Sequence, residues 1–385
     1  MVKTLRNLAL LTLLWTGVQA QAEFTPESLG QVATLPSPYP DHWLIVQDLA
    51  FNHMREGRFY IVDPAATTAG GQMKGILSAD FIASLALSAR RNEIYVIESF
   101  FARGGRGGER TDVVTIYDPA TLDVAGEVVI PAKRLTGMPN HYQVALIDDD
   151  RFMVVYNFTP SQSVSVIDLE TRQFLGEIGI PGCAFVYPTG RRGFSSLCSD
   201  GGLLTTRLQS DGSLEQTERL PSFNDIAADA MFEKPAVIDG IAYFPTFTGN
   251  VVPVDLRGEG ARVGERWALT NTAERDAGWR PGGAWPAIAD RSGRLYVLMH
   301  GHGAEGTHKD GGDQVWVFDA RQGQRLGTIE LNDWGIALGM SAGSDQRLVV
   351  TRADGGVDLY DPRSGERQST LLMSMDTPLL VRGVR

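Results

Sequence analysis

The chain has 385 residues, 43% of them hydrophobic and 21% charged, with a formal net charge of −11. This acidic balance argues against binding to nucleic acid or to anionic membrane surfaces, because both attract clustered positive charge. The length alone would allow two or three domains.

The N-terminus has the three parts of a secretory signal peptide. Lys3 and Arg6 supply a basic start, residues 8–18 are apolar, and small residues end at Ala20 or Ala22. The apolar run is too short to span a bilayer. We therefore expect cleavage after Ala20 or Ala22, export to the periplasm, and no membrane-bound form.

Beyond the N-terminus the chain repeats one pattern. A β-branched or aromatic run ends in an aspartate, a polar glycine-bearing loop follows, and a second apolar run returns. A degenerate seventh copy without the aspartate begins at Gly201. Each aspartate is expected to accept backbone N–H groups in an Asx turn rather than to act as a catalytic acid. The aspartates of the six regular copies are Asp63, Asp118, Asp168, Asp255, Asp319 and Asp361.

The repeat predicts an all-β fold. Another strand-like run precedes each hairpin, and less regular apolar segments further upstream would supply an inner strand. Helical periodicity is almost absent. Seven such units predict a seven-bladed β-propeller of four-stranded antiparallel blades. We expect a signal peptide over residues 1–22, an N-terminal extension over 23–41, and the propeller over 42–385.

The two cysteines lie in one predicted hairpin. A reversal centred on Gly190 and Arg191 would place Cys183 opposite Cys198. Cross-strand neighbours are close enough to bridge, and an oxidising compartment favours the bond. The sequence therefore predicts a structural disulfide rather than a metal-binding or nucleophilic role.

No complete catalytic or metal-binding motif is present. His300, His302 and His308 could chelate a metal, but their glycine-rich loop gives no fixed geometry and their spacing matches no defined site, so no metal site is predicted. A propeller hydrolase would need convergent carboxylates at the channel mouth. Four aspartates could supply these carboxylates, but their spacing in the sequence does not single them out. They are Asp48, Asp80, Asp112 and Asp225.

Aromatic residues gather in the loops that exceed turn length. Propellers commonly carry their functional residues on such loops. These rings could form a docking or substrate-entry surface, and they could equally be local core plugs between blades. The residues are Phe51, Phe100, Phe101, Trp279 and Trp285.

The same loops carry a family resemblance. Six blocks occur in order, namely RGGERTDVVTIYDPATL, PAKRLTG, GCAFVYP, LCSDGGLLTTRL, AGWRPGGAW and VLMHGHGAEGTHK. Together they resemble the heavy subunit of quinoprotein amine dehydrogenases, and the two cysteines stand where that family has its hairpin disulfide. The shorter blocks AFNHM, DGGLLT and EGTHK are more similar to the aromatic amine dehydrogenase than to the methylamine enzyme, which remains the alternative.

The resemblance implies a division of labour between two chains. It implies a light (β) subunit that carries tryptophan tryptophylquinone and the catalytic base, assembled with this chain as α2β2. No catalytic residue and no cofactor is expected on this chain. The complex would deaminate primary amines oxidatively to aldehyde and ammonia and pass electrons to an azurin- or amicyanin-like copper protein.

The resemblance also suggests residues of the substrate channel. Phe51 falls where the family has a phenylalanine beside that channel, and His53 and Met54 are its neighbours in the same loop. A ring at this point would favour an aromatic amine. Two other classes remain as alternatives, a periplasmic propeller that only binds proteins and a propeller hydrolase that acts alone.

Overall fold

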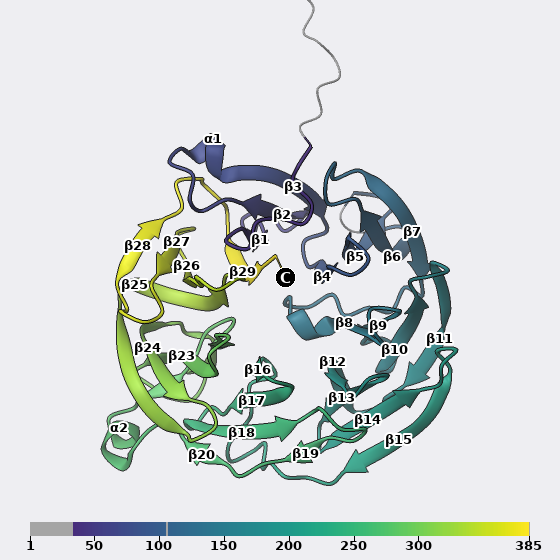
Figure 1. Ribbon diagram of the computed structural model, residues 1–385. Coiled ribbons are helices and arrows are strands. Elements are labelled where there is room, and N and C mark those ends of the chain that lie inside the picture. Colours follow the sequence, from purple (N-terminus) through teal and green to yellow (C-terminus); the bar gives the residue numbers. More distant parts are fainter. Residues whose placement is uncertain (1–33, 105–106, 385) are drawn as a thin grey trace, which may run out of the picture. The chain divides into compact units, whose positions relative to one another are not determined.

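The computed structural model describes residues 34–104 and 107–384. The predicted signal peptide, and all but the last part of the predicted extension 23–41, lie outside this part of the chain. The described residues form six antiparallel sheets arranged around a central axis (Figure 1). The prediction of an all-β propeller with four-stranded blades is confirmed.

Four sheets contain four strands each. In each of them neighbouring strands are also consecutive in sequence, except that β29 pairs with β1. The first combines both ends of the fold, in the order β29 (Pro378–Gly383), β1 (Leu44–Asp48), β2 (Gly57–Val62) and β3 (Met73–Ala79). The second contains β4 (Ser84–Ser88), β5 (Glu93–Phe101), β6 (Arg110–Tyr117) and β7 (Val124–Ile130). The third contains β8 (Val144–Ile147), β9 (Phe152–Asn157), β10 (Ser163–Asp168) and β11 (Gln173–Gly179). The fourth contains β12 (Cys183–Thr189), β13 (Gly193–Cys198), β14 (Leu203–Leu208) and β15 (Leu214–Leu220).

The other two sheets are larger. The fifth contains β16 (Ala236–Ile238), β17 (Ile241–Pro245), β18 (Asn250–Asp255), β19 (Arg262–Val263) and β20 (Trp267–Ala268). The sixth contains β21 (Arg280–Pro281), β22 (Ala287–Ala289), β23 (Arg294–His300), β24 (Gly312–Asp319), β25 (Gln324–Met340), β26 (Leu348–Arg352), β27 (Val357–Tyr360) and β28 (Arg367–Thr370). Helical turns are short, namely α1 (Ala69–Gln72), α2 (Thr272–Asp276), and the 3-10 turns η1 (His141–Gln143) and η2 (Thr307–Lys309).

The long strand β25 joins two halves of the sixth sheet. Its N-terminal part pairs with β24, and its part from Gly335 to Met340 pairs with β26. The chain therefore crosses from one four-stranded unit to the next without leaving the extended conformation.

The aspartates of the repeat form the turns expected of them. In each regular copy the carboxylate accepts the backbone N–H two residues later, as in the 2.7 Å bond from Ala120 to Asp118 and the 2.8 Å bond from Arg363 to Asp361. The degenerate copy is the hairpin of β14 and β15, where Asp211 accepts from Ser213 instead. The prediction that the repeat aspartates form Asx turns is confirmed.

The core lies between neighbouring sheets. Ile45 and Phe59 of the first sheet, for example, pack in one cluster with Ile94 and Val96 of the second. Burial of such β-branched and aromatic side chains contributes roughly 1.5–3 kcal/mol for each residue. Each sheet is thus held by its two neighbours, which fixes the ring and the loops at its ends.

Candidate functional site

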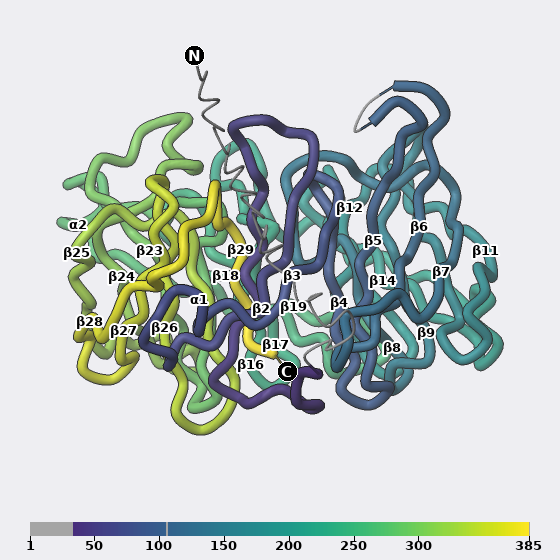
Figure 2. Tube along the Cα trace, turned by 90° about the horizontal axis from the view of Figure 1, so that it is seen from above, coloured from purple at the N-terminus to yellow at the C-terminus, as the bar shows by residue number. Residues whose placement is uncertain are grey.

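One end of the ring carries the longer connections. Because the strands of every sheet are antiparallel, the connection from the second to the third strand and the connection to the next sheet leave at the same end. We call this end the long-loop face. The β1–β2 connection and the β5–β6 hairpin both rise at the upper side of Figure 2, opposite the C-terminus.

Exposed large apolar side chains favour the long-loop face. Among the described residues, the exposed large apolar side chains that lie in connections are all at this end, and Phe100 and Trp334 stand near it within β5 and β25. The other exposed ones lie within strands, some of them at the opposite end. Such a gathering of apolar side chains marks an interaction surface. They are Phe51, Met54, Phe100, Met138, Phe158, Ile226, Trp334 and Leu372.

The β1–β2 connection is anchored at its base. Buried Asp48 accepts the backbone N–H groups of Ala50, Asp376 and Thr377 at 3.1, 2.9 and 2.7 Å. Asn52 Nδ2 donates to Asp376 Oδ2 at 3.0 Å, and this bond lowers the pKa of the Asp376 carboxyl. The loop base is therefore fixed to the β28–β29 connection, although the tip projects outward.

The predicted channel residues lie at this tip. Phe51 is 42% exposed and Met54 is 55% exposed. The Phe51 ring packs edge-on against Phe81, with the ring centroids 5.4 Å apart. His53 is also exposed, and its Nδ1 accepts from Arg55 N at 3.4 Å. The three residues thus stand together at one loop tip on the long-loop face, and their place beside a substrate channel stays a prediction.

A buried charge network lies beneath Phe81. Arg134, 3% exposed, donates through Nη2 to Asp80 at 3.0 and 3.2 Å and to the carbonyls of Ile82 and Ile97 at 3.0 and 3.1 Å. Its backbone N–H donates to Asp112 at 3.0 Å. Arg110 binds the same Asp112 carboxylate with two bonds of 2.7 Å. The network connects the chain leaving the first sheet, the second sheet and the chain entering the third.

Glu98 belongs to the same region. Its carboxylate accepts from Thr115 Oγ1 at 2.7 Å and is 2% exposed. Burial, with a smaller contribution from the charge of Asp80, raises its pKa to about 7, against the lowering effect of the Thr115 bond. Burial likewise raises the pKa of Asp80, against the opposing effect of Arg134. These shifts follow from placing several carboxylates out of water around one arginine.

The four aspartates that a hydrolase acting alone could use are engaged in structural hydrogen bonds. Asp80 and Asp112 serve the Arg134 network, and Asp48 anchors the β1–β2 loop. Asp225 accepts the backbone N–H groups of the turn that follows it, at 3.0 and 3.1 Å. These four groups do not converge on a common cavity. Sequence reasoning missed Arg134, although it stands in the block PAKRLTG that carried part of the resemblance.

The predicted disulfide is present between Cys183 and Cys198, which are direct cross-strand partners. The predicted reversal is wrong in detail. Near the turn Thr189 pairs with Gly193, so the hairpin is centred on Arg191 rather than between Gly190 and Arg191. A bulge at Phe185, with φ of 66°, shifts the register and brings the cysteines opposite each other.

The three loop histidines do not converge. The rings of His300 and His302 are 4.4 Å apart, but His308 lies against Phe247. Within residues 34–104 and 107–384, no group of three or more His, Cys, Asp or Glu side chains is placed to hold a metal ion.

The described tryptophans pack as separate side chains. Trp279 and Trp316 have ring centroids 5.2 Å apart, and Trp316 Nε1 donates to Gln314 at 2.7 Å. In the described part of the chain no helix has the length and apolar character needed to cross a membrane.

The fold and the long-loop face define a propeller protein with an interaction surface at one end of the ring. Its fold is similar to that of the periplasmic gluconolactonase of Pseudomonas aeruginosa, with a TM-score of 0.58, 18% identity, and coverage of 88% of this chain and 98% of that chain. At this identity the likeness concerns the fold alone.

The family model described as methylamine dehydrogenase heavy chain matches residues 44–370, so the chain belongs to that family. It is 27% identical to the methylamine dehydrogenase heavy chain of Methylorubrum extorquens, over 82% of this chain and 76% of that protein. It is 28% identical to the protein of the same name from Methylobacillus flagellatus, over 90% and 88%. The expected amine dehydrogenase heavy-chain resemblance is confirmed. The relatives favour the methylamine alternative over the aromatic amine interpretation.

Proposed function

We propose that this chain is the heavy subunit of a periplasmic amine dehydrogenase that works with a light subunit as α2β2. The family match over residues 44–370 carries the proposal, because it spans almost every strand of the ring. The number of blades belongs to the same proposal. If the sixth sheet is divided at Gly335 of β25, the ring consists of seven units.

The chemistry would belong to the light subunit. Tryptophan tryptophylquinone on that subunit would oxidise a primary amine to an aldehyde and ammonia, with a small copper protein as electron acceptor. The heavy chain would position the light subunit and border the route of the amine. Methylamine or another short primary amine is the first substrate class, because the curated relatives are methylamine dehydrogenase heavy chains. An aromatic amine is the alternative.

The long-loop face is the surface that suits a partner subunit. It presents apolar side chains from several sheets around the Phe51 tip, and Phe51 and Trp334 are only partly covered within the chain. Aromatic residues and methionine are enriched in such interfaces. The disulfide and the N-terminal signal pattern support a periplasmic location.

The proposal is tested by purifying the chain from its native host. A small subunit is expected to co-purify with it, with visible quinone absorption that added methylamine bleaches. Tyramine serves as the aromatic comparison in the same assay. A colourless chain that elutes alone would overturn the proposal and leave a propeller that only binds proteins. Bleaching by tyramine but not by methylamine would restore the aromatic assignment.

Phe51→Ala is expected to change substrate preference without preventing assembly. Removing the ring takes away an aromatic contact at the entrance, so kcat/KM for tyramine should fall relative to methylamine by about tenfold, the size of effect that a pocket contact of this kind produces. Phe158→Ala is the matched control, because it removes another exposed ring of the same face. Unchanged relative kcat/KM in the Phe51 variant would remove this residue from the substrate route.

A further inference from the structure

The centre of the ring holds a cavity of about 510 Å³, lined by residues from the innermost strand of every sheet. Its walls are mostly apolar, with Leu87, Ile288 and Met340 among them. Its charged lining consists of Arg291 and Arg382, with no Asp or Glu. The chain as a whole has 46 acidic and 35 basic residues, so this bias opposes the overall charge. An apolar cavity with a few convergent polar groups is typical of a small-molecule site.

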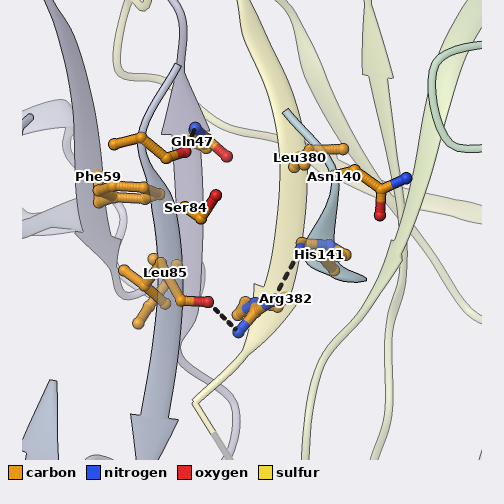
Figure 3. A pocket seen from close by; sticks show the side chains of 10 residues that line it. Gln47, Phe59, Ser84, Leu85, Asn140, His141, Leu380 and Arg382 are labelled. Carbon is orange, nitrogen blue, oxygen red and sulfur yellow. Dashed lines mark hydrogen bonds between the residues drawn. The ribbon is translucent and has the colours of Figure 1, made fainter. Parts of the chain in front are cut away.

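Arg382 has an unusual set of partners. Its Nη2 lies 2.6 Å from His141 Nδ1, and its Nη1 donates to the Leu85 carbonyl at 3.0 Å (Figure 3). Within residues 34–104 and 107–384, no carboxylate lies within ion-pair distance of this guanidinium. Burial lowers its pKa to about 10, which leaves it charged at neutral pH. Charges removed from bulk water are ordinarily paired, whereas this partly buried guanidinium has no counter-ion among the described residues.

The bond to Arg382 fixes the state of His141. An arginine can only donate, so His141 Nδ1 must accept and the ring carries its proton on Nε2. Burial, together with the Arg382 charge, lowers the pKa of His141 well below its usual range. The ring is therefore neutral, and its free nitrogen is a hydrogen-bond donor.

Two further donors next to this pair have no acceptor among the described residues. Trp285 is 2% exposed and lines the axial cavity, and its Nε1 has no hydrogen-bond partner. Its ring packs edge-on against His141 with the centroids 4.4 Å apart. Asn140 Nδ2 is also buried without a partner, beside a second cavity of about 10 Å³ that Arg382 and His141 line as well (Figure 3). Buried donors are rarely left unpaired in proteins.

We propose that the axial cavity binds a small organic anion, a monocarboxylate with an apolar body, whose carboxylate occupies the donors of Arg382, His141 and Trp285. A carboxylate offers only acceptors and supplies the missing negative charge. The apolar walls would cover the rest of the ligand. This site lies inside the ring and is independent of the proposed amine dehydrogenase function on the long-loop face.

The test is calorimetric titration of the purified chain, with any subunit that co-purifies, using benzoate as the probe. Benzamide has the same apolar ring without the charge, and acetate has the charge without the ring. Benzoate is expected to bind at least about tenfold more tightly than either, since a hydrogen bond to a charged group and the burial of a ring each have an effect of that order. Equal binding of benzoate and benzamide would overturn the proposal.

Variants locate the site. Arg382→Gln should weaken benzoate binding by about tenfold or more, and Trp285→Phe, which keeps the ring packing, by several-fold to tenfold. Arg382→Lys should retain part of the affinity because it keeps the charge. Arg363→Gln is the control, because Arg363 is exposed and lies outside the cavity lining. If Arg382→Gln does not fold, the benzoate affinities of Trp285→Phe and Arg382→Lys test the assignment instead. Wild-type benzoate affinity in the folded variants would contradict the assignment.

Discussion

Replacing Arg134 with alanine is expected to lower the free energy of unfolding by about 3–5 kcal/mol, because it removes one partner from a buried charge network. Asp80 would keep its burial but lose the guanidinium 3.0 Å away. The backbone carbonyls of Ile82 and Ile97 would lose their donor as well. The variant is measured by urea denaturation at neutral pH.

The expected loss depends on pH. Burial already raises the pKa of Asp80, and without Arg134 this carboxyl would bind a proton more readily. The variant should therefore lose less stability at pH 5 than at pH 7.5, because protonation removes the unpaired charge.

An exposed ion pair provides the control for Arg134. Arg321 and Asp239 are 2.6 Å apart, and their side chains are 70% and 67% exposed. Arg321→Ala should change the free energy of unfolding by less than about 1 kcal/mol, as is usual for surface pairs. If Arg134→Ala were as mild as Arg321→Ala, the Arg134 network would not stabilise the second sheet and the connections on either side of it.

The local parts of the fold could be read from the sequence. The repeat aspartates specify their own turns, because the carboxylate and the N–H that it binds lie two residues apart. Hairpins likewise have both strands close in sequence. The pairing that closes the ring joins Leu44 to Gly383, and no local pattern records such a partnership. The continuous strand β25 was missed for a related reason, because its two halves serve different neighbours.

The candidate sites divide in the same way. Phe51, His53 and Met54 are adjacent in sequence and share the loop tip, so a resemblance over a short block could find them. The Arg134 network and the Arg382 pair each combine residues from distant segments. Arg382 contacts His141 across 241 residues of sequence. Only the closed ring brings these two residues together.

Replacing both Cys183 and Cys198 with alanine is expected to lower the free energy of unfolding by about 3 kcal/mol, the value that the chain-entropy model gives for a loop of this length. The bond closes a loop with a sequence separation of 15. Both cysteines are almost fully buried in the cluster formed with Val186 and Phe194, so the alanines also lose a little packing. Urea denaturation compares the double variant with the oxidised wild type.

The reducing agent supplies the internal control for the disulfide. Dithiothreitol should lower the stability of the wild type to about that of the double variant and leave the variant itself unchanged. The bulge at Phe185 shifts the register of the hairpin so that the two cysteines face each other. Phe185 adopts a positive φ there, which is unfavourable for a residue with a side chain. The bond therefore retains a register that the turn alone would not give. A double variant as stable as the oxidised wild type would show that packing against the neighbouring sheets is sufficient to hold this hairpin.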